Sequence, residues 1–320
     1  MRPPFEITPR AAGLLSEIER ALGRHEGSLT APPSPMLRRS LKVRTIQSSV
    51  AIEGNTLTEE QVTALLEGRR VNAPERDLLE VKNAIACYEK LPVWNPGSPK
   101  HFLAAHKVMM KDLVDRPGAW RTSGVGIAKG NVISHVAPPA ARAPGLVGSL
   151  LEWVKKDNEV PAPVRAAVCH YELEFIHPFQ DGNGRMGRLW HSLILSRYHS
   201  VFAHVPVESA VKDRQAEYYE VLGRCDNAGK STEFIEFALQ ATLEALGSVA
   251  SSSDRKMTSS ERIEEARAGF ANNWFSRKDY IARFPSLSPA TASRDLKAAV
   301  DVGLIGREGD KATSRYRFIR

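Results

Sequence analysis

One twelve-residue stretch, HPFQDGNGRMGR at positions 177–188, constrains the fold of this chain more than any other. It lies between two apolar segments, residues 164–176 and 189–195, which we expect to be buried helices. The first helix should end at His177, because the residue before a proline is disfavoured in the α region. The stretch is then a glycine-rich loop leading into a helix N-terminus, where free N–H groups and the helix dipole bind anions. A phosphate group is the anion that we expect there.

The glycines and arginines of the stretch suit a phosphate chain. Glycine allows positive φ angles and a close approach of the backbone to phosphate oxygens, which a Cβ would prevent. The glycines concerned are Gly182, Gly184 and Gly187. Arg185 and Arg188 stand three residues apart on one helix face, and each can grip phosphate oxygens with a planar fork. The stretch therefore predicts an anion site made of backbone and two cations.

Two further residues of the stretch bring metal and acid–base chemistry. Asp181 would repel phosphate unless a divalent cation lay between them, and Mg²⁺ is commonly held by one carboxylate together with substrate oxygens. His177 is the natural general base for a hydroxyl, because imidazole titrates near neutral pH. A hydrolytic metal centre is a weaker alternative, since no His-Glu-x-x-His spacing supports it. Its ligands would be His170, His177, Asp181 and His191.

The stretch resembles, position for position, the His-x-Phe-x-Asp/Glu-Gly-Asn-Gly-Arg-x-x-Arg signature of the Fic (Fido) family. Members of that family typically transfer AMP from ATP to a hydroxyl group of a protein. The resemblance implies that His177 is the base on the target hydroxyl, that Asp181 binds Mg²⁺, and that Phe179 anchors the loop. The nucleotide-binding residues that it implies are Gly182, Asn183 and Gly184 for the α and β phosphates, Arg185 for the phosphate chain, and Arg188 for the γ-phosphate.

A second motif lies nearer the N-terminus. Ser49 and Glu53 are one helical turn apart at the end of an expected helix over 36–52, and Gly54 suits its C-cap. Ser-x-x-x-Glu-Gly resembles the inhibitory motif that one Fic subgroup carries ahead of the signature in the same chain. The resemblance implies that Glu53 pairs with Arg188 and obstructs the γ-phosphate, since a fork built for phosphate also accepts a carboxylate.

The segments around these motifs predict further helices and one hairpin. Valine- and isoleucine-rich segments between 118 and 139 flank Lys129-Gly130-Asn131, which predicts a β-hairpin. In the Fic family a hairpin at this place, the flap, lies over the active site and holds the target segment by strand addition. The family also places a tyrosine-bearing helix near the adenine, so Tyr218 and Tyr219 are candidate walls of the nucleotide pocket.

Composition narrows the setting of this chemistry. With 320 residues the chain is long enough for about two domains with an ordinary buried core. Its three cysteines are far apart in sequence, which argues against disulfides and a structural zinc site and fits a reducing cytoplasm. The first residues lack the apolar core of a signal peptide, and no run of about 18 apolar residues occurs. We therefore expect a cytoplasmic protein that does not enter a membrane.

The net charge of +7 is concentrated near the C-terminus. Residues 255–320 contain 14 Lys and Arg against 8 Asp and Glu, a net charge of +6, which points to a polyanionic partner. After a Ser-rich stretch at 248–260, the pattern predicts three helices followed by two strands. Their expected bounds are 261–272, 276–284 and 289–302 for the helices and 304–307 and 314–318 for the strands. This order resembles a winged helix-turn-helix module of the kind that some bacterial Fic proteins carry.

If this module binds DNA, the helix over 289–302 is its recognition helix. The residues that would face the DNA are Thr291, Ser293, Arg294 and Lys297, with Arg307, Lys311 and Arg315 on the wing. A small domain that docks a protein or forms a dimer is the alternative, since winged helices often do so.

We therefore expect a mainly α fold: a Fic-type helical core with a β-hairpin flap, plus a C-terminal winged-helix (α+β) domain. The expected regions are an N-terminal helical region with the inhibitory helix at 1–95, the catalytic core at 96–247, a linker at 248–260 and the winged helix-turn-helix module at 261–320. The expected activity is Mg²⁺-dependent transfer of AMP from ATP to a Ser, Thr or Tyr hydroxyl of a target protein or of the chain itself, held off by Glu53. Removal of AMP, transfer of another phosphate-bearing group, and a DNA-binding regulator whose Fic core senses nucleotide are the alternatives. A homodimer is compatible with the sequence.

Overall fold

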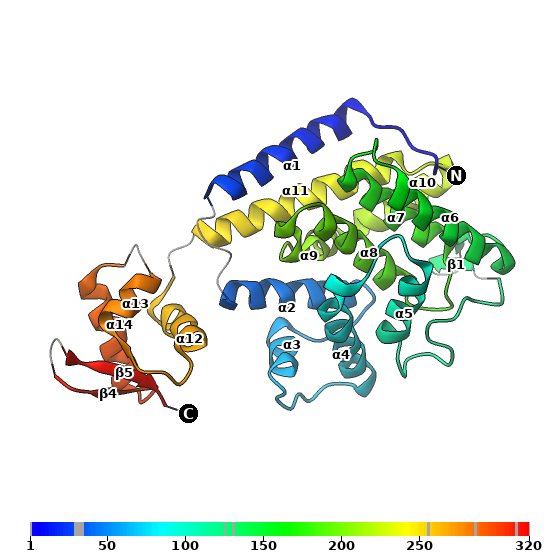
Figure 1. The fold of residues 1–320 in the computed structure, drawn as a ribbon. Helices are drawn as coiled ribbons and strands as arrows, with labels where there is room; N and C mark the ends of the chain where they lie inside the picture. Colours follow the sequence, from blue (N-terminus) through cyan, green and yellow to red (C-terminus); the bar gives the residue numbers. More distant parts are fainter. Residues whose placement is uncertain are drawn as a thin grey trace. The chain divides into compact units, whose positions relative to one another are not determined.

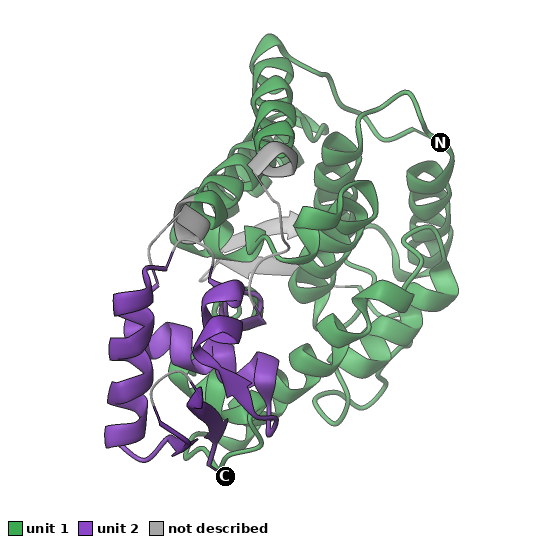
Figure 2. Ribbon diagram, turned by 60° about the vertical axis from the view of Figure 1, so that its left-hand side comes forward, with its two compact units in different colours: residues 1–30, 41–250 green, residues 31–40, 251–320 purple. Residues whose placement is uncertain are grey.

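The structure is a computed structural model, and it describes residues 2–28, 35–124, 126–129, 132–254, 257–284, 287–310 and 313–319. The chain divides into two compact units, which Figure 2 shows in different colours. Unit 1 comprises residues 1–30 and 41–250, and unit 2 comprises residues 31–40 and 251–320. The expected mainly helical fold is confirmed.

Unit 1 consists of helices and one β-hairpin (Figure 1). Its helices are α1 (Pro9–Ser28), α2 (Pro35–Ala51), α3 (Glu59–Leu66), α4 (Glu75–Glu89), α5 (Pro99–Met109), α6 (Ala143–Lys156), α7 (Ala162–Ile176), α8 (Asn183–Tyr198), α9 (Val207–Asp213), α10 (Gln215–Ala228) and α11 (Thr232–Asp254). Short 3₁₀ helices join some of them: η1 (Leu91–Val93), η2 (Ala140–Arg142) and η3 (Ser200–Ala203). Helices α2 and α11 each extend from unit 1 into residues of unit 2.

Helices α7 and α8 lie side by side at the centre of unit 1 (Figure 1). Neighbouring elements cover both helices on several sides, so most of their residues are buried, and Val168, Trp190 and Leu193 are fully buried. Since neither helix has a wide solvent face, the short loop that joins them is held at a fixed place in the core. That loop, residues 177–182, carries the first half of the signature.

The end of α2 is turned sharply toward this loop. The helix stops at Ala51, and Gly54 adopts φ +93°, which favours glycine. Asn55 then ties the turn to α4, because its Nδ2 donates to Glu80 Oε2 at 2.9 Å. Helix α3 follows with a capping box in which Thr58 and Gln61 satisfy each other's backbone N–H groups. Glu53 therefore lies on a turn that is fixed from both sides.

The predicted hairpin is present. Strands β1 (Gly126–Lys129) and β2 (Val132–Val136) pair antiparallel, with Lys129 opposite Val132 and a register irregularity between Ile127 and Ala128. The turn residues Gly130 and Asn131, and Val125 before the first strand, lie outside the described residues.

Unit 2 has its own apolar core and a small antiparallel sheet. Its elements, in chain order, are α12 (Ser259–Phe270), β3 (Phe275–Ser276), α13 (Arg277–Arg283), α14 (Pro289–Asp301), β4 (Ile305–Glu308) and β5 (Arg315–Phe318). The sheet order is β3-β5-β4. Phe275, Tyr280, Leu296 and Phe318 are among the side chains that form the core. The two-residue strand β3 was not predicted, because so short a run has no period to detect.

One segment differs from the expectation. The sequence predicts a linker over 248–260, yet α11 continues through 248–254 to Asp254, and α12 begins at Ser259. Leu246 and Val249 are buried, and their packing outweighs the low helix propensity of the serines that follow. Residues 255 and 256 lie outside the described residues. Across the described residues, no helix is both long enough and apolar enough to cross a membrane.

Candidate functional site

His177 ends α7 in a left-handed backbone conformation, with φ 48° and ψ 59°. Its N–H still donates to Leu173 O at 3.0 Å, so the last turn of the helix is closed before the chain turns away. Pro178 explains why His177 leaves the right-handed α region. For a residue with a Cβ the left-handed conformation costs roughly 1–2 kcal/mol, so surrounding contacts must hold it.

The loop after His177 is anchored by Phe179, which is fully buried. Its ring stacks on His106 with the ring centroids 3.6 Å apart, and it also stacks on Phe102 and Trp120. Asn183 closes the loop, because its Oδ1 accepts from Phe179 N–H and its Nδ2 donates to Phe179 O, both at 2.9 Å. The side chain of Asn183 is thus used inside the loop, and only its backbone N–H is left for an anion.

The N-terminus of α8 follows directly. Gly182 is the N-cap with φ 86°, a conformation that favours glycine, and a Cβ there would lie 2.6 Å from Met110 Sδ. The N–H groups at 183–185 have no acceptor within the helix, as at any helix N-terminus. Oε1 of Glu53 lies against Gly184, where it would overlap an added Cβ. A carboxylate therefore occupies the region beside this helix N-terminus where the sequence predicts a phosphate.

Asp181 and Arg185 form one polar group with α4. Asp181 Oδ1 accepts from Gly182 N–H at 2.6 Å and from Arg185 Nη2 at 3.0 Å. Arg185 is buried, and its Nη1 also donates to Glu80 Oε1 at 3.3 Å. Arg76 Nη2 lies 3.5 Å from Asp181 Oδ2. Arg185 is therefore held between two carboxylates.

The environment of Asp181 fits a magnesium ion that binds together with a phosphate chain. The Asp181 side chain is 41% exposed, and Oδ2 has one long contact, to Arg76. Among the described residues, no group of three or more His, Cys, Asp or Glu could hold a metal by itself. A single carboxylate supplemented by substrate oxygens is an arrangement that Mg²⁺ accepts.

Arg188 is buried and meets the end of α2. Its Nη2 donates to Glu53 Oε1 at 2.5 Å and to Ser49 O at 2.9 Å, and its Nε lies 3.5 Å from Ser49 Oγ. Burial opposes the charge of Arg188, but the nearby Glu53 carboxylate outweighs it, and the pKa of Arg188 is raised. The sequence predicts that Arg185 and Arg188 share one face, whereas the structure gives the two guanidinium groups different partners.

Gly187 has a different environment from the one expected. It was predicted to let the backbone approach phosphate, but it faces α7, where a Cβ would lie 2.7 Å from His170 Cδ2 and 3.0 Å from Glu174 Oε1. Position 187 is more than one turn into α8, so its backbone N–H is used within the helix. Gly187 therefore serves the close packing of α7 on α8.

The two tyrosines of α10 lie in different environments. Tyr218 is buried, with its hydroxyl 3.1 Å from His170 Nε2 and 3.3 Å from Glu174 Oε1. Burial raises the pKa of Glu174 to about 7. Tyr219 is 41% exposed and donates to Ile52 O at 3.3 Å, one residue before Glu53. Of the two, Tyr219 is therefore on the accessible side, beside the Ser49–Glu53 motif.

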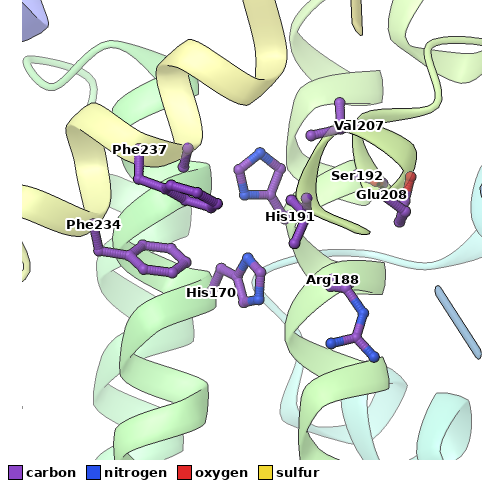
Figure 3. Close-up of a pocket in the computed structure, with 10 residues that line it drawn as sticks. His170, Arg188, His191, Ser192, Val207, Glu208, Phe234 and Phe237 are labelled. Carbon is purple, nitrogen blue, oxygen red and sulfur yellow. Dashed lines mark hydrogen bonds between the residues drawn. The ribbon is translucent and has the colours of Figure 1, made fainter. Parts of the chain in front are cut away.

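A small cavity, with Arg188 in its lining, lies between α7, α8, α9 and α11 (Figure 3). His170 projects from α7 and His191 from α8, while Phe234 and Phe237 of α11 cover one side (Figure 3). Burial lowers the pKa of both histidines to about 3, so both rings are neutral. Buried polar atoms without a hydrogen-bond partner among the described residues border it: Arg188 Nη1, Glu208 Oε2 and both ring nitrogens of His191. Such atoms are where buried water is expected.

Two residues without a predicted role at the signature loop hold it in place. His106 Nδ1 accepts from Gly118 N–H at 2.8 Å, so its Nε2–H donates to Asp181 O at 3.0 Å. Burial lowers the pKa of His106 to about 4 and keeps the ring neutral. Arg121 donates from Nε to His177 O at 2.6 Å. These residues precede their partners by 75 and 56 positions, so no local pattern could have indicated them.

Comparison with known proteins shows the family. A profile of the Fic/DOC family matches residues 96–195, which include the whole signature. A Fic family protein from Desulfovibrio desulfuricans G20, known from its crystal structure, is 40% identical to this chain. The match covers 100% of this chain and 98% of that protein, with a TM-score of 0.74. The chain belongs to the Fic family.

Other Fic proteins are similar over part of their length. "Protein adenylyltransferase Fic" of Nematostella vectensis is 29% identical over 67% of this chain and 51% of its own length. "Protein adenylyltransferase fic-1" of Caenorhabditis elegans is 29% identical over 82% of this chain and 57% of its own length. The chain thus spans about half the length of these curated relatives. A structure of residues 134–508 of C. elegans Fic-1 shares the fold, with a TM-score of 0.60 at 24% identity.

Proposed function

We propose that this chain is a protein adenylyltransferase that transfers AMP from ATP to a hydroxyl group of a target protein. The observation that carries the proposal is the position of His177, which the buried Phe179 holds on a short loop directly before the anion-binding N-terminus of α8. A base and a phosphate site are thereby brought to one edge of the α7–α8 pair. The relatives named as Fic protein adenylyltransferases support the same activity.

Each residue then has a role in the transfer. The target hydroxyl attacks the α-phosphorus of ATP, its proton passes to His177, and pyrophosphate leaves. The free N–H groups at 183–185 and the guanidinium groups of Arg185 and Arg188 stabilise the negative charge on the phosphate chain. Mg²⁺, held by Asp181 and phosphate oxygens, would add positive charge at the same place. Tyr219 is the more accessible of the two proposed adenine neighbours.

The Ser49–Glu53 motif is proposed to inhibit the enzyme. The Glu53 carboxylate uses the Arg188 Nη2 and lies against Gly184, which supports the idea that it competes with the γ-phosphate. Ser49 contributes its carbonyl oxygen and hydroxyl to the same guanidinium. Removal of AMP, with Glu53 orienting a water, uses the same residues and is the alternative at this site.

Labelled ATP distinguishes transfer of AMP from transfer of a phosphoryl group and from nucleotide sensing. Protein carrying Glu53→Gly is incubated with Mg²⁺ and ATP labelled at either the α or the γ phosphate, and self-labelling is followed. Transfer of AMP labels protein only from the α position, whereas phosphoryl transfer labels only from the γ position. Absence of any label on the chain or on added cell extract, with ATP still bound, would favour the nucleotide-sensing alternative.

Unit 2 supports a second proposal, that residues 261–320 form a winged helix-turn-helix module that binds DNA. Its three helices and antiparallel hairpin, in the order α12-β3-α13-α14-β4-β5, resemble such a module. Arg277 at the start of α13 donates to Ser293 Oγ of α14, and Arg294 and Lys297 on α14 are exposed. Arg307 is partly used by Asp310 and Ser314, and Lys311 lies outside the described residues. Docking of a protein or dimerisation through this module is the alternative.

A further inference from the structure

Arg121 joins the loop that carries His177 to the segments on either side of the β-hairpin. Its side chain is buried, with 4% of the residue exposed. Nε donates to His177 O at 2.6 Å, and Nη2 lies 3.3 Å from Ile176 O. Nη1 donates to Ser123 O at 2.8 Å, and Nη2 also donates to Pro138 O. Ser123 precedes β1 and Pro138 follows β2, so one guanidinium contacts both ends of the hairpin and the end of α7.

The backbone of the same residue adds a further link. Arg121 N–H donates to Pro178 O at 3.0 Å. The carbonyl oxygens of three consecutive residues, 176–178, are therefore all bound by Arg121. Two of them, Ile176 O and His177 O, belong to the helix end. Carbonyl groups there receive no N–H donor from within the helix, so they attract a cation.

The electrostatics of Arg121 indicate a specific task. In the part of the chain that the structure describes, no carboxylate forms an ion pair with Arg121, and burial lowers its pKa. Burying a cation without a counter-ion costs folding free energy, and hydrogen bonds from its N–H groups must offset that cost. Here they bind carbonyl oxygens in several directions, which a planar guanidinium with five N–H groups can do and an ammonium cannot.

We propose that Arg121 is the positioning residue of the active site, which fixes the left-handed backbone of His177 relative to both ends of the hairpin. The inference rests on the proposed adenylyl transfer, in which His177 must meet a target hydroxyl. A displacement of the hairpin is transmitted to His177 through one rigid side chain. Arg121 touches no part of the α8 N-terminus in the described structure, so it acts on the base and leaves phosphate binding to other groups.

The test compares Arg121→Lys with a matched control, Arg165→Lys, both in the Glu53→Gly protein. Arg165 also donates from Nη1 to a carbonyl oxygen, Val154 O at 2.8 Å, but near the opposite end of α7. Calorimetric titration with Mg-ATP gives the affinity and the fraction of molecules able to bind. The rate of self-labelling from α-labelled ATP is then measured at saturating ATP and divided by that fraction. We expect Arg121→Lys to lower this rate about 100-fold, as a displacement of about 1 Å of a catalytic group does, with ATP affinity unchanged in both variants.

A second readout does not depend on activity. The imidazole C–H resonances of His177, assigned by their loss in His177→Ala, should shift in Arg121→Lys and stay in place in Arg165→Lys. If the Glu53→Gly protein does not label at all, the proposed function fails, while the resonances still test the positioning. An unshifted His177 resonance or an unchanged rate per ATP-binding molecule in Arg121→Lys would overturn the inference. Should Arg121→Lys fail to bind ATP, Arg121→Gln, which removes the buried charge and keeps an amide donor, takes its place with the same two outcomes.

Discussion

The guanidinium of Arg188 and the carboxylate of Glu53 meet with Nη2 and Oε1 2.5 Å apart, although 135 positions separate the two residues in the chain. Arg188 is 2% exposed, whereas 30% of the Glu53 side chain is open to solvent. The cation is thus enclosed in the core of unit 1, whereas the Glu53 side chain is the partner that solvent and a ligand can reach. Because of this difference in exposure, Glu53 is the residue to replace in order to free the Arg188 guanidinium for a ligand.

Replacing Glu53 with glycine should free Arg188 for the γ-phosphate. A hydrogen bond to a charged group contributes about 1.5–3 kcal/mol, so ATP affinity should rise about 10- to 100-fold, and self-labelling should rise with it. The free protein should also unfold at a lower temperature, since Arg188 loses its counter-ion, and Mg-ATP should restore the loss. Calorimetry and thermal unfolding with and without Mg-ATP measure both effects.

Two variants control for this change. Glu53→Gln keeps the shape and removes the charge, so its affinity should lie between those of the wild type and Glu53→Gly. Glu60→Gln, on an exposed position of α3, should behave as the wild type. Equal ATP affinity in the wild type and Glu53→Gly would show that Glu53 is an ordinary helix-end residue.

His177→Ala should stop transfer without weakening ATP binding. A positioned general base contributes roughly 10²- to 10⁴-fold in rate, and the imidazole Nδ1 of His177 lies 3.4 Å from Glu174 O on α7. Self-labelling from α-labelled ATP in the Glu53→Gly background is the measurement, with His204→Ala as the control histidine. Labelling at the same rate in His177→Ala would contradict the assigned mechanism.

Acid should remove the contribution of His106 to stability. Its folded pKa of about 4 lies below the unfolded value of about 6.5, so the unfolded chain binds more protons between these values and stability falls as pH decreases from 6.5 to 4. The free-energy difference between the wild type and His106→Asn should therefore shrink across this window, by up to about 3 kcal/mol. Urea unfolding at pH 7.5, 6 and 5 measures it. The buried His170 and His191 occur in both proteins, so their titration cancels.

A core substitution without a titratable group serves as the reference for this experiment. Val62→Ala, at a fully buried position of α3, should destabilise the protein by a similar amount at every pH. A difference for His106→Asn that is equally constant would mean that the neutral ring of His106 is not required.

DNA binding by unit 2 should depend steeply on salt. Each phosphate contact makes the slope of log affinity against log salt more negative by about 0.9. Arg294→Ala together with Lys297→Ala should therefore make the slope less steep by about 2 if both residues contact phosphate. Fluorescence anisotropy of a labelled mixed-sequence duplex, titrated with the full chain over a salt series, measures this. Arg267→Ala, an exposed arginine on α12, is the matched control. No binding at low salt would exclude DNA and favour docking or dimerisation.

Much of the α7–α8 loop was predictable from neighbouring residues alone. The end of α7 follows from Pro178, the positive φ of Gly182 from its glycine, and the buried anchor from Phe179. Apart from β3, the element order of unit 2 followed from capping residues and alternation, which act within a few positions. Pairing of Glu53 with Arg188 was expected only through the family resemblance, because no local rule relates residues so far apart.

The sequence by itself determined where helices begin and end around the signature, and which residue types line it, because steric limits on the backbone and helix capping are local effects. Only the tertiary structure decided how those residues are used. It assigned Asn183 to the loop, Gly187 to the packing of α7, and Arg121 to the carbonyl groups around His177. It also extended α11 through the serines at 251–253, since burial of Val249 outweighs a weak local preference. Buried polar groups must form hydrogen bonds with whichever groups the fold brings near them, and no single segment of the chain determines those partners.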